Sequence, residues 1–205
     1  TLSENLYNKF ALKRVYYSAY VPVNSGKNLP DIKNPPTLRE HRLYQGDWLL
    51  RVYGFNSNEL LNEANPNFDI NFDPKTTYAL NNIHLFPVEI NKAPYEMLIR
   101  VPGIGIRGAK KIVSARRVNS LDFLDLKKLG IVLKRAQYFI TCRGKYFGAV
   151  SFDELKIKKA LKPKVDLNYI DEDIEQISFF DAPSISENNK LLLLNDKSTS
   201  LTGEL

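Results

Sequence analysis

The chain has 205 residues, 43% of them apolar and 25% charged, with a formal net charge of +6. This length is enough for one or two domains with a buried core, and no apolar run is long enough to predict a membrane span. The single cysteine excludes an internal disulfide and any multi-cysteine metal or cluster site built from this chain alone. We therefore expect a cytoplasmic protein, and the start at Thr1 rather than Met predicts a processed chain or a fragment.

The basic residues are concentrated in one part of the chain. Residues 1–90 carry nine basic and nine acidic side chains, whereas residues 91–145 carry thirteen basic and three acidic ones, a net charge of +10. The net charge is +3 over residues 146–165 and −7 over residues 166–205. A basic segment of this kind favours a polyanionic partner such as nucleic acid.

The first part of the chain predicts one strand and two helices. Residues 12–23 are rich in tyrosine and valine, which predicts a strand. Proline and glycine predict a loop over 24–38, and apolar residues at helical spacing then predict a helix from about 38 to 53. Residues 57–62 are predicted to form a short helix capped by Ser57.

The next segment contains clear boundary signals. Asp73 followed by Pro74 is typical of an N-cap and the first residue of a helix, which should end near Asn82. Residues 86–90 are predicted to be extended, because the proline at the second position disfavours the helical conformation of the residue before it. Asn91 is predicted to cap the helix that follows.

The strongest signal is the run Val101-Pro102-Gly103-Ile104-Gly105, which lies between two apolar helical segments. A tight connection between packed helices needs a positive φ, which glycine adopts at little cost. The second helix would begin with unpaired amides at the positive end of its dipole, and together these bind anions. We predict a nucleic-acid phosphate there; a hairpin without a ligand is the alternative. The predicted DNA-binding residues are Arg100, Gly103, Ile104, Gly105, Ile106, Arg107, Lys110 and Lys111.

A second, weaker copy of this pattern follows at an offset of 27 residues. Ser120 is predicted to cap a helix over 122–128, and another helix is predicted over 133–141. At this offset Gly130 corresponds to Gly103, Val132 to Gly105 and Ala136 to Ala109. We therefore predict a degenerate second hairpin in which Lys134 and Arg135 contact the opposite DNA strand, or alternatively form a solvated helix end.

The C-terminal part predicts a helix over 152–160 and an acidic tail over 166–205. One apolar segment of the tail resembles the short peptide by which bacterial DNA-processing proteins dock on the sliding clamp. Its predicted contact residues are Gln176, Ile177, Phe179 and Phe180. The alternative is an apolar patch that folds back on the body of the protein.

The sequence shows no recognisable catalytic centre. No Ser/His/Asp set, phosphate loop or dinucleotide-binding glycine motif is present. The two histidines, His41 and His84, have no neighbours at metal-ligand spacing. Whether the chain is an enzyme therefore stays open at this point.

Residues 98–105, together with Ala109 and Ile112, resemble the helix-hairpin-helix of DNA repair and polymerase proteins. The resemblance implies binding of double-stranded DNA without sequence preference. It also implies a monovalent cation held by hairpin carbonyls, which bridges to a phosphate oxygen. Carried over by position, the ligands would be the carbonyl oxygens of Ile99, Val101 and Ile104.

A wider resemblance covers about residues 6–150. The segments 12–20, 38–55 and 84–91 are similar to the C-terminal half of bacterial radical SAM proteins associated with DNA modification or repair. The resemblance implies a [4Fe–4S] cluster and S-adenosylmethionine in an N-terminal partial α/β barrel, of which the strand at 12–21 would be a late member. Because this chain has one cysteine, the cluster site is absent from it.

These observations predict a mostly α fold in three parts. Residues 1–64 would contain the strand and the long helix as a remnant of a partial α/β barrel. Residues 65–148 would form a tandem helix-hairpin-helix DNA-binding domain. Residues 149–205 would form a C-terminal extension that is first basic and then acidic. The expected function is sequence-independent DNA binding that positions DNA within a radical SAM DNA modification or repair protein. The alternative is an adaptor that docks on the bacterial sliding clamp through its tail.

Overall fold

The computed structural model describes residues 2–23, 26–30 and 32–162. Its sheet has the strand order β1-β2-β3, and none of the described helices is long and apolar enough to cross a membrane. The expectation of a mostly helical fold is confirmed. The elements are α1 (Leu2–Phe10), α2 (Thr37–Tyr53), α3 (Ser57–Leu60), α4 (Pro74–Asn81), the 3-10 helix η1 (Ile83–Leu85), β1 (Val88–Glu89), α5 (Tyr95–Leu98), α6 (Ile106–Ala115), α7 (Phe123–Lys128), α8 (Leu133–Ala136), β2 (Ile140–Cys142), β3 (Lys145–Tyr146) and α9 (Glu154–Leu161).

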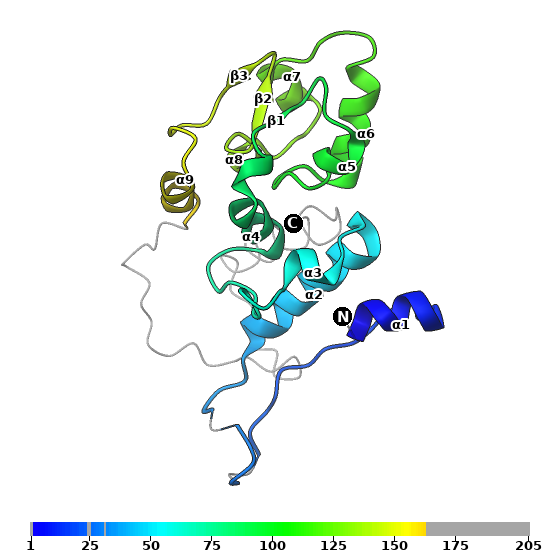
Figure 1. Ribbon diagram of the computed structural model, residues 1–205, viewed down its shortest axis with the longest axis vertical. Helices are drawn as coiled ribbons and strands as arrows, with labels where there is room; N and C mark the ends of the chain where they lie inside the picture. Colours follow the sequence, from blue (N-terminus) through cyan, green and yellow to red (C-terminus); the bar gives the residue numbers. More distant parts are fainter. Residues whose placement is uncertain (1, 24–25, 31, 163–205) are drawn as a thin grey trace, which may run out of the picture.

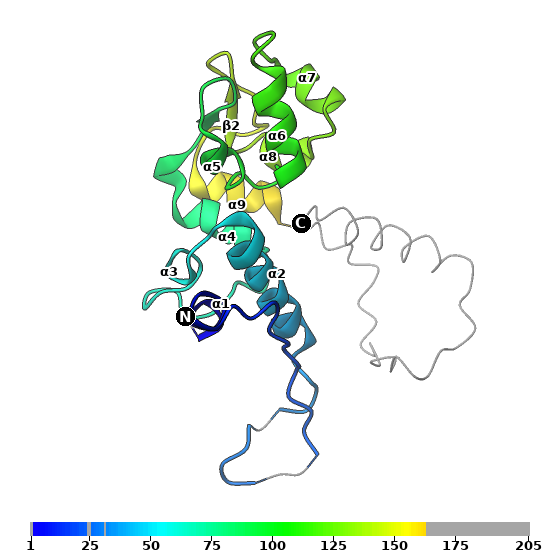
Figure 2. The ribbon, with the colours of Figure 1, turned by 90° about the vertical axis from the view of Figure 1, so that its right-hand side faces the viewer.

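The elements form two groups with α4 between them (Figure 1). Helices α5 to α8 and the sheet lie at one end of the molecule, and α1 to α3 lie at the other. The view turned by 90° shows the same division, with α9 close to α4 (Figure 2). The buried side chains nevertheless form one cluster, which extends from Leu49 on α2 through Leu80 on α4 to Ile104 and Phe139. Hydrophobic packing therefore continues across the predicted boundary near residue 64.

The predicted strand at 12–23 is wrong: this segment is extended but forms no strand. Its alternate amides donate to side chains on α1 and α2 instead of to a neighbouring strand. The Val15 amide donates to the Tyr7 hydroxyl (3.0 Å), that of Tyr17 to the Tyr44 hydroxyl (3.0 Å), and that of Ala19 to the Glu40 carboxylate (2.9 Å). The segment is thus an extended chain that lies on two helices, and the described residues contain no remnant of a barrel at this point.

Several helix boundaries agree with the sequence, and others differ by one or two residues. Asp73 caps α4 by accepting from the Thr76 amide (3.0 Å), as predicted. The N-cap of α3 is Asn56 and not the predicted Ser57. The Ser57 hydroxyl is not available as a cap because it donates to the Glu4 carboxylate on α1. Asp122 rather than Ser120 caps α7.

The cap predicted at Asn91 is also wrong, since Pro94 directly precedes α5. The Asn91 side chain instead joins the start of the basic segment to the residue just before Asp122, the N-cap of α7. It accepts from the Leu121 amide (2.7 Å) and donates to the Leu121 carbonyl (3.0 Å). The polar residue therefore supports a tertiary contact rather than a helix end.

The helix predicted over 133–141 is shorter than expected, because residues 140–142 form β2. Strand β2 pairs in parallel with β1, with Val88 opposite Ile140, and antiparallel with β3. The Glu89 carboxylate holds this sheet by accepting from the Thr141 hydroxyl (3.0 Å) and the Gly144 amide (2.8 Å). Burial raises the pKa of Glu89, but these hydrogen bonds and those from Asn91 outweigh it and hold the pKa below its ordinary value.

At the C-terminal side, α9 confirms the helix predicted over 152–160. Asp153 caps this helix by accepting from the Lys156 amide (3.0 Å). The predicted acidic tail, including Gln176, Ile177, Phe179 and Phe180, lies outside the described residues.

Candidate nucleic-acid interface

The first hairpin joins α5 to α6 through a tight turn over 101–105. The Ile104 amide donates to the Val101 carbonyl (3.1 Å), and Gly103 has a φ of +85°. Glycine is needed here for a second reason. A Cβ on Gly103 would lie 2.5 Å from the carbonyl oxygen of Val132, so the turn packs directly on the start of α8.

The second hairpin joins α7 to α8 and shares the positive φ of the turn glycine, although its Ile131 amide donates to Leu126 and not to the residue equivalent to Val101. Gly130 has a φ of +82°, close to the +85° of Gly103. Ile131 and Ala136 are buried, as are Ile104 and Ala109 at the corresponding positions of the first hairpin. The predicted 27-residue repeat is therefore confirmed, although α8 has only four residues.

The two hairpins pack on each other through backbone and small residues. The Val132 amide donates to the Gly103 carbonyl (3.3 Å), which joins the two turns. A Cβ on Gly108 would lie 2.6 Å from the Cδ1 atom of Ile131, so this glycine makes room for the second turn. Lys111 donates to the Leu129 carbonyl (3.0 Å) at the end of α7. The hairpins thus form one rigid unit rather than two separate motifs.

The start of α6 has backbone amides without a side-chain cap. Its N-cap is Gly105, which has no side-chain oxygen to accept from them. By contrast, aspartates cap α4, α7 and α9. The first amides of a helix have no partner within the helix, and they lie at the positive end of its dipole. The start of α6 therefore has the properties of an anion site.

Comparison with known families agrees with this geometry. Residues 86–144 match the family model described as the helix-hairpin-helix motif. This motif is generally involved in DNA binding without sequence preference. The matched range begins just before β1 and ends after β2, so it contains both hairpins. Comparisons with curated proteins and with solved structures gave no significant match.

Most of the predicted contact residues lie on the helices that follow the two turns of the helix-hairpin-helix unit. Arg107, Lys110 and Lys111 are exposed on α6, and Lys134 and Arg135 are exposed on α8. Gly105 and Ile106 are half-buried, whereas Ile104 is fully buried, and both its amide and its carbonyl are engaged within the protein. Arg135 is 46% exposed and pairs with Asp73 (3.2 Å). The Asp73 side chain is 11% exposed, so only the Arg135 side of this pair faces solvent, and a phosphate must compete with Asp73 for the guanidinium.

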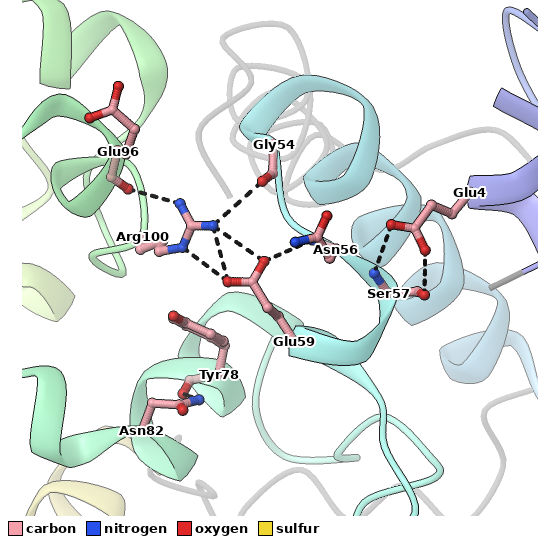
Figure 3. Close-up of polar contacts among 9 residues, drawn as sticks. All are labelled: Glu4, Gly54, Asn56, Ser57, Glu59, Tyr78, Asn82, Glu96 and Arg100. Atoms are coloured by element: carbon pink, nitrogen blue, oxygen red, sulfur yellow. Dashed lines mark hydrogen bonds and ion pairs between the residues drawn. The ribbon is translucent and has the colours of Figure 1, made fainter. Parts of the chain in front are cut away.

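Arg100 differs from the other predicted contact residues, because it is turned toward α3 (Figure 3). Its Nη2 atom lies 3.0 Å from Oε1 of Glu59, and its Nη1 atom donates to the Glu96 carbonyl (3.0 Å). The guanidinium also stacks 4.8 Å from the ring centroid of Phe55. Its side chain is only 16% exposed. These contacts join the first hairpin to α3, a structural role that the sequence did not indicate.

We expect Arg100→Ala to lower stability rather than DNA affinity. It would leave the carboxylate of the half-buried Glu59 without its partner, and the free energy of unfolding should fall by about 1–2 kcal/mol. Urea unfolding followed by circular dichroism measures the loss. A duplex affinity reduced more than about tenfold with unchanged stability would instead make Arg100 a DNA contact.

Two of the three carbonyls predicted to hold a cation have partners within the protein. That of Val101 accepts from the Ile104 amide, and that of Ile104 accepts from the ammonium of Lys75 on α4 (2.6 Å). Lys75 is 3% exposed, and burial lowers its pKa to about 7. Sequence reasoning missed this residue, because a lysine in the first turn of a helix ordinarily indicates an exposed face.

Proposed function

We propose that this chain binds double-stranded DNA through its phosphates and without sequence preference. The observation that carries the proposal is the uncapped start of α6 at Gly105, with Arg107 and Lys110 exposed on the same helix. The match of residues 86–144 to the helix-hairpin-helix motif supports it independently. Contacts of this kind read no bases, so affinity should depend on salt far more than on sequence.

The second hairpin supports binding to both strands of a duplex. Its turn glycine shares the positive φ of the first, and Lys134 lies in the first turn of α8, as Arg107 does in α6. We propose that Arg107, Lys110 and Lys111 neutralise phosphates of one strand, while Lys134 and Arg135 neutralise those of the other. The net charge of +10 over residues 91–145 supplies the long-range attraction.

The salt dependence of duplex binding tests this proposal. The slope of log affinity against log salt concentration should become shallower by about 0.9 for each phosphate contact that is removed. We therefore expect a change of about 1.8 in the slope for the double variant Lys110→Ala, Lys134→Ala. Fluorescence anisotropy with a labelled duplex of arbitrary sequence measures the slope.

A matched control is Lys9→Ala. Lys9 is an exposed lysine on α1, at the opposite end of the molecule (Figure 1). Its removal changes the net charge but should leave the slope unchanged. Equal slopes for the double variant and the wild type would contradict phosphate binding by α6 and α8.

We further propose that this DNA-binding unit belongs to a larger protein that acts on DNA, as the radical SAM resemblance of residues 6–150 suggests. This chain does not fit the iron–sulfur cluster of such a protein. Clusters of this type are held by several thiolates, and the chain has one cysteine. That residue, Cys142, is buried, and burial raises its pKa to about 12. Any radical chemistry would therefore be done by residues outside this sequence.

A further inference from the structure

The ammonium of Lys75 lies in an unusual place beneath the first hairpin. Its Nζ atom donates to the carbonyl oxygen of Ile104 (2.6 Å) and lies 4.7 Å from the ring centroid of Tyr53. Lysines are almost never buried unless paired, because the ammonium loses its water. Both observed contacts are with groups that stabilise a cation, a carbonyl oxygen and an aromatic face.

These contacts do not fit a monovalent metal ion held by the carbonyls of Ile99, Val101 and Ile104. The Ile104 oxygen already binds a positive charge, and a metal ion on the same oxygen would be repelled by the ammonium. The Val101 oxygen already accepts the amide that closes the turn. Two of the three expected ligands are therefore engaged within the protein.

We propose that Lys75 supplies the positive charge of the first hairpin from within the protein, so that the hairpin binds a DNA phosphate without a monovalent metal ion. This inference rests on the proposed function. The ammonium acts through the peptide group between Ile104 and Gly105. A hydrogen bond to the carbonyl polarises this peptide group and makes its N–H, on Gly105, a stronger donor. The Gly105 amide is one of the groups predicted to face the phosphate.

The experiment compares duplex binding by the full chain in potassium chloride and in tetramethylammonium chloride at equal ionic strength. Tetramethylammonium is too large to be held by three hairpin carbonyls, so a hairpin that needs a metal ion loses affinity in it. We expect the two dissociation constants to agree within about twofold. A loss of about tenfold or more in tetramethylammonium would overturn the inference while leaving the proposed function intact. Absence of binding in both salts would overturn the proposed function, and this inference with it.

A variant tests the residue itself. Lys75→Met keeps most of the buried volume but removes the ammonium, so we expect it to bind duplex DNA about tenfold more weakly than the wild type. Lys92→Met, at an exposed lysine of the same unit, is the control and should bind as tightly as the wild type. Wild-type affinity in a folded Lys75→Met variant would overturn the inference. If that variant does not fold, the comparison of the two salts decides the question.

Discussion

A Gly105→Asp variant is expected to fold at least as well as the wild type and to lose most of its affinity for duplex DNA. Gly105 has φ and ψ of −82° and 173°, in the same extended region as Asp73, the cap of α4, at −68° and 156°. An aspartate therefore fits the backbone, and its carboxylate can accept from the open amides of α6. The side chain would occupy the site that we assign to a phosphate.

The two effects have opposite signs, which makes the variant informative. An aspartate cap and its interaction with the helix dipole should raise the free energy of unfolding by up to about 1 kcal/mol. Loss of charge-assisted hydrogen bonds to a phosphate, together with repulsion by the carboxylate, should weaken DNA binding by about tenfold to a hundredfold. Thermal unfolding and anisotropy titrations measure the two quantities on the same preparation.

Two further variants separate the causes. Gly105→Ala adds a Cβ without a carboxylate, so it should keep most of the affinity if charge is the cause. Asn119→Asp, at an exposed position beyond α6, makes the same change in net charge away from the amides. Wild-type affinity in Gly105→Asp would rule out the start of α6 as the phosphate site.

A Gly103→Ala variant is expected to cause the largest loss of stability. At a φ of +85° a Cβ is strained, and here it would also lie 2.5 Å from the Val132 carbonyl oxygen and 3.0 Å from the Ala136 amide nitrogen. Because all of these atoms belong to the backbone, the two hairpins must separate. We expect the free energy of unfolding to fall by about 3 kcal/mol or more, with DNA binding reduced as well.

Gly144→Ala is the matched control for this variant. Gly144 also has a positive φ, +72°, but a Cβ there would meet nothing within 4 Å. The free energy of unfolding of the Gly144→Ala variant should therefore fall by about 1 kcal/mol, the cost of the backbone strain alone. Urea unfolding gives the difference between the two variants. Equal losses would show that contact between the hairpins contributes nothing to the requirement for glycine at 103.

The sequence predicted the elements whose signals are local. The two hairpins followed from the spacing of Gly103 and Gly130, because positive φ at a tight turn is a requirement of the backbone itself. The start of α4 followed from Asp73 and Pro74, because a capping side chain and a proline in the first turn are local signals of a helix start. The segment at 12–23 was misassigned because its backbone amides bond to side chains on α1 and α2 and not to a second strand.

The roles of two basic residues were beyond sequence reasoning. Arg100 and Lys75 have the same composition signals as exposed cations, yet one is paired with Glu59 and the other is buried against Ile104. Both roles depend on how α3 and α4 pack against the first hairpin. The sequence assigned Arg100 to the DNA-binding surface and gave Lys75 no role, whereas the contacts show that both residues hold the first hairpin to α3 and α4.

The pairing of β2 with β1 and β3 determines where the chain enters and leaves the hairpin unit. Strand β3 runs antiparallel to β2, so Tyr146 lies opposite Thr141, while Val88 and Glu89 flank β2 on its other side. Entry and exit are therefore two strand spacings apart, about 10 Å. Neighbouring ends would let this segment be inserted into a surface loop without stretching its backbone. Its buried core, however, is shared with α2 and α4, so a transplanted unit would expose apolar surface unless these helices moved with it.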